Sequence, residues 1–328
     1  MTSPATSPAT VRFGTRRSAL ARAQSGRVAA DFAAATGHDV ELVEITTEGD
    51  VSQAALAQIG GTGVFVGALR EALLDGRVDV AVHSLKDLPT APAEGVALAA
   101  VPPREDPRDV LVARDGLTLG ELPVGARVGT GSPRRVAQIQ ALGLGLDLVG
   151  VRGNVDTRIA KVASGELDAV VLARAGLARL DRVADATEVL DPIQVLPAPG
   201  QGALAVESRA GDPLETELRE ALDDPRSRAA VTCERAVLAT LEAGCSAPVG
   251  ALAEVVEGDD GDELWVRAVA LSPDGALDVR RSASGSVTAA EEVGRTLAGE
   301  MLADGAADLM HQTTAASVTT TTTTGQQQ

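Results

Sequence analysis

The chain has 328 residues, of which 45% are apolar and only 1% aromatic, so alanine, valine and leucine must supply its cores. A chain of this length can bury two or three cores, and a formal net charge of −17 argues against general affinity for nucleic acid. Among the 29 basic residues only Lys86 and Lys161 are lysines. Arginines that cluster in short glycine- and serine-containing motifs of an acidic protein predict defined sites for a small anion.

Cysteine content and hydropathy exclude several other classes of protein. Cys233 and Cys245 are too few, and too far apart, for a disulfide framework or a zinc site. The three histidines are scattered along the chain and make no metal cluster. No apolar run has the length of a bilayer span, and residues 1–10 lack the charged start and apolar core of a secretory signal. We therefore expect a soluble, cytoplasmic protein.

The predicted elements alternate between strand and helix along the chain. Residues 1–10 and 313–328 are low-complexity and predict disordered tails. Between the tails, the apolar pattern predicts helices over 18–37 and 64–76 and buried strands over 40–49, 78–84, 126–130, 146–151 and 167–173. Strands that alternate with helices indicate an α/β fold with parallel sheet.

Two internal similarities indicate a duplication. Residues 73–88 align without gaps on 162–177, and each copy reads as a helix end, a glycine turn, a buried strand and a loop. In the same way "RFGTRRS" at 12–18 resembles "RVGTGSPRR" at 127–135. The sequence therefore predicts two α/β domains of similar topology.

The expected domain boundaries follow from this duplication. The first domain covers 11–102 plus a return segment at about 198–215, and the second covers 104–196. A third, α+β domain covers 216–312, where two strands flank a Pro-Asp-Gly turn. Open parallel sheets bind ligands beyond the carboxyl ends of their strands. Two such domains joined by two crossings would face each other across a cleft.

Two similar motifs follow the first strand of each repeat. Free N–H groups at a helix N-terminus, hydroxyls and guanidinium groups together suit a carboxylate or a phosphate. The candidates are Arg16 and Ser18 in "GTRRSAL", and Thr130, Ser132, Arg134 and Arg135 in "GTGSPRR". The alternative is ordinary helix capping by Ser18 and Ser132, with the arginines solvated.

A third basic motif, "VRGNVDTRIAK", places Arg152 in a loop and Arg158 in the second turn of the next helix. Both arginines could hold an anion. The alternative is a helix start whose arginines pair with Asp156 and Glu166, which would contribute little stability on the surface.

The stretch "VHSLKDLP" places one of the two lysines, Lys86, beside Asp87 at the end of a buried strand. The carboxylate could accept hydrogen bonds from ligand N–H groups and stabilise a developing cation. The alternative is a loop held by a salt bridge. His83 falls inside the strand, where a core histidine bonded to backbone is favoured over a catalytic one.

The stretch "LEAGCSAPVG" contains Cys245 where a helical pattern stops, whereas Cys233 lies inside that pattern. Cys245 could be a small hydrophobe that closes the helix, a nucleophile or an attachment point. A nucleophile normally needs a histidine within reach, and no histidine motif accompanies this cysteine. From the residues alone, the favoured interpretation of Cys245 is a buried thiol at a helix end.

Taken together, the motifs resemble the hydroxymethylbilane synthase family, also called porphobilinogen deaminases. The resemblance runs from Val11 to about His311, with the motifs in the order of the family. It rests on "GTRRSALA", "GGTGVFVGALREALL", "DVAVHSLKDLPT", "REDPRD", "GTGSPRR", "VRGNVDTR", "LARAGLARL", "LPAPGQGA" and "LEAGCSAPVG".

The resemblance implies a three-domain fold, with two duplicated domains like type II periplasmic binding proteins and a third small α+β domain. It implies a transferase that joins four porphobilinogen molecules head to tail with loss of ammonia, after which water releases the linear tetrapyrrole hydroxymethylbilane. The growing chain would be carried on a dipyrromethane cofactor bound through a thioether to Cys245. The family suggests a monomer.

The resemblance also implies roles for individual residues. Asp87 would be the catalytic carboxylate that contacts pyrrole N–H groups. The expected cofactor-binding residues, besides Cys245, are Lys86, Thr130, Ser132, Arg134, Arg135 and Arg158, and the expected substrate-binding residues are Arg16, Ser18, Arg152 and Arg179. Gln58 and Thr62 depart from the family pattern, which often has lysines there. Arg174 cannot be matched to a family position.

The sequence leaves two hypotheses from other functional classes open. The duplicated cleft fold would also suit a binding protein without catalysis. A thiol enzyme could use Cys245 for acyl transfer. The lack of an export signal, the third domain, and the presence of both Cys245 and Asp87 argue against the binding protein.

Overall fold

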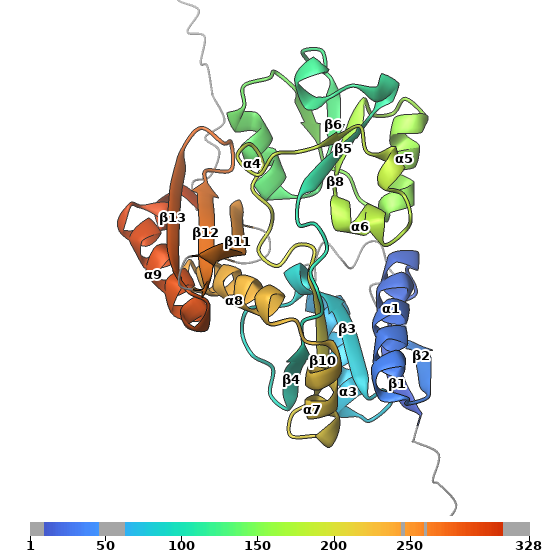
Figure 1. Cartoon of the computed structure of the whole chain (residues 1–328). Helices are drawn as coiled ribbons and strands as arrows, with labels where there is room; N and C mark the ends of the chain where they lie inside the picture. The colour runs from blue at the N-terminus through green and yellow to red at the C-terminus, as the bar shows by residue number, and fades with distance from the viewer. Residues whose placement is uncertain (1–9, 46–62, 244–246, 259–260, 311–328) are drawn as a thin grey trace, which may run out of the picture.

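The computed structural model describes residues 10–45, 63–243, 247–258 and 261–310, which form three units (Figure 1). The strands are β1 Val11–Thr15, β2 Val40–Glu44, β3 Val80–Ser84, β4 Val96–Ala100, β5 Asp109–Ala113, β6 Arg127–Gly129, β7 Asp147–Val149, β8 Ala169–Ala173, β9 Glu188–Val189, β10 Leu204–Arg209, β11 Val249–Gly258, β12 Gly261–Leu271 and β13 Asp278–Ser286. The helices are α1 Ala19–Thr36, α3 Gly63–Leu74, α4 Pro133–Ala141, α5 Val155–Ala163, α6 Arg174–Ala178, α7 Pro213–Leu222, α8 Pro225–Thr240, α9 Ala290–Ala303 and α10 Ala306–Met310.

The first two units have five-stranded sheets of the same topology. One sheet has the order β2-β1-β3-β10-β4 and the other the order β7-β6-β8-β5-β9. The aligned repeat is confirmed, because β3 and β8 begin at matching residues, Val80 and Ala169. The expectation of parallel sheet is wrong for one strand of each unit. Strands β10 and β5 run antiparallel to their neighbours because each arrives through a crossing from the other unit.

The duplication extends to individual hydrogen bonds. In the first unit, the backbone N–H of Arg12 donates to a carboxylate oxygen of Asp79 at 3.1 Å. In the second, the backbone N–H of Arg127 donates to Asp168 at 2.7 Å. Each aspartate directly precedes the central strand of its sheet, so the same contact fixes that strand against its neighbour in both units.

The core of the first unit includes residues from its return segment. Phe13 of β1 and Phe32 of α1 pack with ring centroids 5.8 Å apart, and Leu218 and Leu222 of α7 belong to the same apolar cluster. Helix α7 also packs against α1 and β4. The first unit therefore extends through α7 to Leu222, beyond the boundary expected near residue 215.

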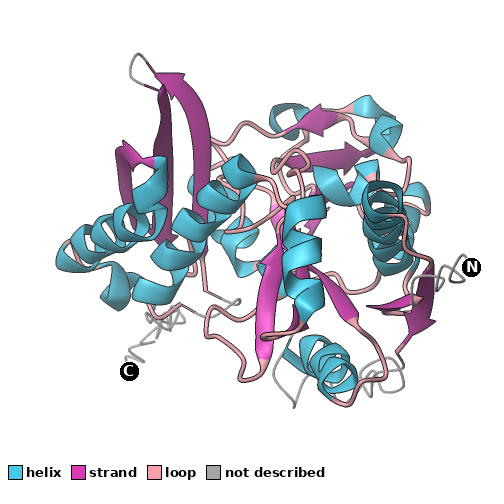
Figure 2. Ribbon diagram, turned by 60° about the horizontal axis from the view of Figure 1, so that its bottom comes forward, coloured by secondary structure: helices cyan, strands magenta, loops and turns pink. Residues whose placement is uncertain are grey.

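The third unit is an antiparallel sheet of order β11-β12-β13, with α8 and α9 beside it (Figure 2). Strands β12 and β13 are the expected pair, and they flank the turn at Pro273–Gly275. Helices α8 and α9 approach closely at Gly294, where a Cβ atom would lie 2.3 Å from the carbonyl oxygen of Cys233. Only glycine fits such a contact without a shift of backbone.

A buried carboxylate connects this third unit to both crossings. Glu234 of α8 is fully buried and forms a two-pronged ion pair with Arg104, with N–O distances of 2.7 and 3.0 Å. The backbone N–H of Gly200 on the return crossing donates to Glu234 at 2.6 Å, and that of Ala253 on β11 donates at 2.8 Å. Glu234 therefore fixes three segments that are distant in sequence.

This arrangement predicts a large stability loss for Glu234→Gln. The change leaves the charge of the buried Arg104 side chain unpaired, which costs about 3–5 kcal/mol in other proteins. We expect a clearly lower urea midpoint when unfolding is followed by circular dichroism. The matched control is Glu254→Gln, which removes an exposed pair with Arg267 on the same sheet and should change the free energy of unfolding by at most about 1 kcal/mol. Equal midpoints for the two variants would contradict the role of Glu234.

Candidate functional site

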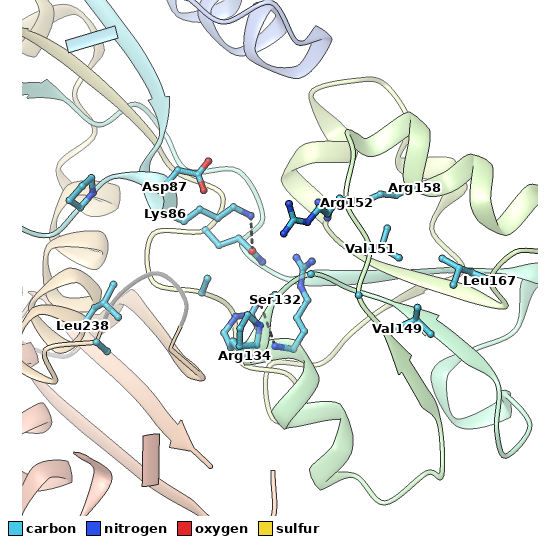
Figure 3. Close-up of a pocket in the computed structure, with 18 of the residues that line it drawn as sticks. Lys86, Asp87, Ser132, Arg134, Val149, Val151, Arg152, Arg158, Leu167 and Leu238 are labelled. Atoms are coloured by element: carbon cyan, nitrogen blue, oxygen red, sulfur yellow. Dashed lines mark hydrogen bonds between the residues drawn. The ribbon is translucent and has the colours of Figure 1, made fainter. Parts of the chain in front are cut away.

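A cleft between the first two units contains most of the residues expected at the site. It consists of a larger cavity of about 1320 Å³ and a smaller one of about 350 Å³. Lys86, Asp87, Arg135 and Arg158 line both cavities, so the two are parts of one cleft. In Figure 3, Lys86 and Asp87 approach this cleft from one unit, and Arg152 and Arg158 approach from the other.

The wall of the larger cavity is strongly cationic, although the chain carries a net charge of −17. Its charged residues are the cations Lys86, Arg134, Arg135, Arg152, Arg158 and Lys161 and the carboxylates Asp87 and Glu166. Both lysines of the chain lie on this wall. A surface of one sign inside a concave site concentrates ligands of the opposite sign, so the cleft suits a ligand with several carboxylates.

Lys86 and Asp87 lie on a single 3₁₀ turn, η2 Leu85–Asp87, that follows β3. The buried Leu85 anchors the turn, and its backbone N–H donates to the carbonyl of Ala203 at 3.0 Å. The Asp87 carboxylate accepts no hydrogen bond and forms no ion pair within residues 10–45, 63–243, 247–258 and 261–310. The loop is therefore not held by a salt bridge between these two side chains, and the Asp87 oxygens are available to a ligand.

The ammonium of Lys86 donates to Oε1 of Gln201 at 3.2 Å. Burial, and secondly the positive charge of Arg135, lower the pKa of Lys86 to about 8. The nearby carboxylates of Asp87 and Asp109 act in the opposite direction. Lys86 is thus a cation whose charge is sensitive to its surroundings near neutral pH.

Arg134 and Arg135 are buried and share one carboxylate, Asp109 of β5. Arg134 Nη2 lies 2.8 Å from Asp109 Oδ2, and Arg135 Nη2 lies 2.7 Å from Oδ1. Burial alone would raise the pKa of Asp109, but the two guanidinium groups outweigh it and hold this pKa well below its ordinary value. Their remaining terminal nitrogens donate to the carbonyls of Leu196 and Val171.

That these arginines bind an anionic ligand stays a prediction, and part of their charge is already neutralised by Asp109. Both side chains line the larger cavity, and the buried Nε atom of each has no partner among the described residues. The sequence alone did not identify Asp109 as their partner. Its signal was its position in "REDPRD", at the point where the chain crosses into the second unit.

The serines of the two similar motifs both cap helices, as the alternative interpretation expected. Ser18 Oγ accepts the backbone N–H of Ala21 at 3.2 Å, and Ser132 Oγ accepts that of Arg135 at 3.5 Å. Each serine also lines one of the two cavities. Thr130 is buried, accepts the backbone N–H of Ser132 at 3.2 Å and lines neither cavity.

Arg152 and Arg158 point into the cleft without a carboxylate partner in the described part of the chain (Figure 3). Arg158 Nε donates to the carbonyl of Gly153 at 2.9 Å, and its pKa is lowered by burial and by Arg135. The alternative pairing is wrong, because Asp156 pairs with Arg182 and Glu166 pairs with Lys161.

Arg16 and Arg179 line the smaller cavity from opposite units. Arg179 Nη2 donates to the carbonyl of Gly202 at 2.6 Å, so it also contacts the return crossing. Burial lowers the pKa of Arg179 to about 10, although the Glu105 carboxylate opposes the shift. Arg16 and Arg179 are therefore two cations that line only the smaller cavity.

His83 lies in the core, as expected, but its contact differs from the expected one. Its Nε2 lies 3.3 Å from the carboxylate of Glu207 rather than against a backbone group. Glu207 is in turn held by Arg70, with N–O distances of 2.6 and 3.0 Å. His83 lines neither cavity of the cleft.

Of the two cysteines, Cys233 is fully buried in the core of the third unit. Burial raises the pKa of its thiol to about 12, so the reactive thiolate is scarce at neutral pH. Cys245, Gln58 and Thr62 lie outside the described residues. Ala243, two positions before Cys245 in the sequence, lines the larger cavity.

The described part of the chain contains no cluster of three histidine, cysteine or acidic side chains that could hold a metal ion. Among the helices that the structure describes, none is long and apolar enough to span a bilayer.

Two family models match the chain. The model described as "Porphobilinogen deaminase, dipyromethane cofactor binding domain" matches residues 11–246. The model described as "Porphobilinogen deaminase, C-terminal domain" matches residues 228–303. Together they cover residues 11–303, which include parts of all three units.

Several relatives are similar over nearly their whole length. Porphobilinogen deaminase of Mycobacterium tuberculosis (strain ATCC 25618 / H37Rv) is 58% identical over 305 residues, covering 92% of this chain and 98% of the relative. The protein of the same name in Nocardia farcinica is 57% identical over 310 residues, covering 93% and 89%. Porphobilinogen deaminase 1 of Streptomyces coelicolor is 59% identical over 309 residues, covering 92% and 97%.

Among solved structures, a putative methionine-binding lipoprotein of Bacillus subtilis aligns with a TM-score of 0.41 at 14% identity, covering 66% of this chain and 92% of that one. The methionine-binding protein MetQ aligns with a TM-score of 0.41 at 12% identity, covering 65% and 89%.

Proposed function

The chain belongs to the porphobilinogen deaminase family, and from this premise we propose how its cleft performs the hydroxymethylbilane synthase reaction. Four porphobilinogen molecules are joined head to tail with loss of ammonia, and water releases the linear tetrapyrrole. In this proposal Asp87 is the catalytic carboxylate, and the cations around it hold the acetate and propionate groups. The enzyme acts as a monomer in the cytoplasm on this small-molecule substrate, without nucleic acid or membrane.

The observation that carries the proposal is a cationic cleft around the carboxylate of Asp87, which has no partner in the part of the chain that the structure describes. Each pyrrole unit bears two carboxylates, so a chain of pyrroles needs many cations on one wall. Arg152 and Arg158 have no carboxylate partner in the described residues, and the buried Nε atoms of Arg134 and Arg135 have no acceptor there. These unused donors fit a bound polyanion.

The same donors fit the dipyrromethane cofactor named by the matching family model. When bound, this group supplies the free pyrrole position to which the first substrate is added. We assign its carboxylates to Lys86, Ser132, Arg134, Arg135 and Arg158, which line the larger cavity. Thr130 lies behind Ser132 and would support it through its hydrogen bond rather than touch the cofactor.

The attachment point in this proposal is Cys245. The chain has only two cysteines, and the other, Cys233, is buried with a raised pKa. Ala243 on the cavity wall precedes Cys245 by two residues, which supports attachment at this cavity. The residues assigned to the incoming substrate are Arg16, Ser18, Arg152 and Arg179.

Asp87 has two tasks in this arrangement. Its oxygens accept hydrogen bonds from pyrrole N–H groups, which orients the ring. When ammonia departs from the aminomethyl group, the C–N electron pair leaves with it and the pyrrole becomes cationic. A carboxylate held at that place, in a site partly closed to water, stabilises the charge as it forms. Lys86 beside it adds a cation for the carboxylates of the cofactor.

This assignment predicts an effect for Arg152→Gln that depends on salt. Loss of one charge-assisted contact should raise KM for porphobilinogen by roughly 10-fold or more, and the loss should shrink at high salt, where screening weakens the wild-type contact. The control is Arg114→Gln, which changes an arginine outside both cavities that pairs with Asp115 and Asp168. Initial rates at low and high salt measure both variants. An unchanged KM in Arg152→Gln would contradict the assignment.

A non-catalytic binding protein would also use a cationic cleft. It would not need a free carboxylate beside the ammonium at the centre of that cleft. The family membership and the position of Asp87 in both cavities favour the enzyme.

A further inference from the structure

Gln201 lies on the return crossing between the two units. Its side chain is buried and has no role in the proposed reaction so far. Its Oε1 accepts from the ammonium of Lys86 at 3.2 Å. Its Nε2 donates to Asp109 Oδ1 at 2.7 Å and to the carbonyl of Pro107 at 2.7 Å. One amide therefore connects the turn that carries Asp87 with the start of β5 in the second unit.

The orientation of this amide follows from its partners. The side of Asp109 and Pro107 offers only acceptors, and an ammonium offers only donors. Rotation of the amide by half a turn would place its oxygen against two oxygens and its NH₂ group against the ammonium. Gln201 is also 1% exposed, so water cannot replace a lost partner easily. The contacts thus fix a single arrangement.

We propose that Gln201 is a positioning residue, which holds the Lys86 ammonium beside Asp87 and sets its place relative to the Arg134–Arg135 pair through Asp109. The inference rests on the proposed function of Lys86 and Asp87. It adds that the two units of the cleft are aligned at the reacting centre by one hydrogen-bonded chain, from Lys86 through Gln201 to Asp109.

Packing around the crossing supports a fixed position for this amide. Gly202, the next residue, has φ +87°, and a Cβ atom there would lie 2.3 Å from the carbonyl oxygen of Glu105. The backbone N–H of Glu105 donates to the carbonyl of Gly202 at 3.2 Å. Arg104 Nε also donates to the carbonyl of Gln201 itself at 2.8 Å. The two crossings are therefore in direct contact at Gln201 and Gly202.

The charged groups that act on Lys86 come from three elements. Asp87 lies on its own turn, Arg134 and Arg135 lie on α4, and Asp109 lies on β5. Without the acceptor oxygen of Gln201, the ammonium loses a contact that favours its charged form, and its pKa falls further below the ordinary lysine value. A glutamate at position 201 would meet Asp109 and Pro107 with an oxygen, so it would be held there as the protonated acid and donate as the amide does, and the pKa of Lys86 would stay near its wild-type value.

The test compares Gln201→Met with Gln201→Glu in the cofactor-loaded enzyme. Lys86 acts as a cation, so activity should fall as pH rises through its pKa, and Lys86→Arg should remove this alkaline limb. Gln201→Met should lower kcat by roughly 10-fold or more with a smaller change in KM, and it should move the limb to lower pH. Gln201→Glu, which as the protonated acid keeps both contacts, should leave the limb near its wild-type position. A role in stability alone would move the limb in neither variant.

A double-mutant cycle with Lys86→Met then separates the positioning role of Gln201 from the proposed function of Lys86 itself. If Gln201 acts through Lys86, adding Gln201→Met to Lys86→Met causes no further loss of kcat, whereas additive losses overturn the inference. Normal turnover in Lys86→Met would contradict the proposed function itself. Impaired Lys86→Met with a normal Gln201→Met would overturn only the inference. Should Gln201→Met not fold, the limb of Gln201→Asn decides, because the shorter amide cannot reach both Lys86 and Asp109, and an unmoved limb there overturns the role of Gln201.

Discussion

Asp87→Asn is expected to abolish most turnover while the fold remains intact. The carboxylate has no structural partner in the described residues, so the isosteric amide should not disturb packing. The amide cannot balance the positive charge that forms on the pyrrole, and it cannot take part in proton transfer, which contributes about 10²–10⁴-fold in enzymes of known mechanism. We expect kcat for porphobilinogen consumption to fall by a factor in this range. The circular dichroism spectrum should not change.

Two further variants sharpen this test. Asp87→Glu keeps the carboxylate but displaces it by one methylene, and it should recover part of the lost rate. Asp115→Asn is the matched control, because Asp115 is exposed, lies outside both cavities and has φ 56°, a backbone conformation that asparagine tolerates. Its kcat should equal that of the wild type. Turnover of Asp87→Asn within a few-fold of the wild type would reject the catalytic role.

Cys245→Ser is expected to lose the covalent cofactor and, with it, activity. The intact mass of the denatured wild-type protein should exceed the mass of the 328-residue chain by two pyrrole units, whereas Cys245→Ser should have no such addition. A serine hydroxyl cannot form the thioether, so the growing chain has no anchor. An unmodified mass in active wild-type protein would contradict the attachment.

Cys233 provides an internal control for this experiment. Cys233→Ala should keep the added mass and most of the activity, with a moderate loss of stability from the buried cavity. After denaturation, loaded Cys233→Ala should have no thiol that iodoacetamide can alkylate, because Cys245 is blocked. A reactive thiol in that protein, together with full activity, would again contradict attachment at Cys245.

Local rules allowed much of the fold to be predicted. Helix α1 begins one residue after its predicted capping serine, Ser18, and the gap-free repeat places Val80 and Ala169 at the start of equivalent strands. Capping and apolar periodicity act within a few residues, so the sequence displays them directly. The direction of β5 and β10 was not predicted, because it depends on which sheet a strand joins after it crosses between units.

The candidate site, too, could be predicted only in part from the sequence. The sequence singled out Lys86, Asp87, Arg152 and Arg158, which all line the larger cavity, because their motifs follow predicted buried strands. It did not distinguish Arg158, whose guanidinium has no carboxylate partner among the described residues, from Arg134, which is buried against Asp109. Both look alike as basic residues near a helix start.

By itself, the sequence determined the duplication, the helix caps and the set of cations available to an anionic ligand, because these depend on residue type and short-range spacing. Only the tertiary structure decided which charges are already neutralised. Asp109, Gln201 and Glu234 meet partners 19 to 130 positions away. A buried charge must be paired where packing encloses it, and that pairing is fixed by the way the three units enclose the cleft.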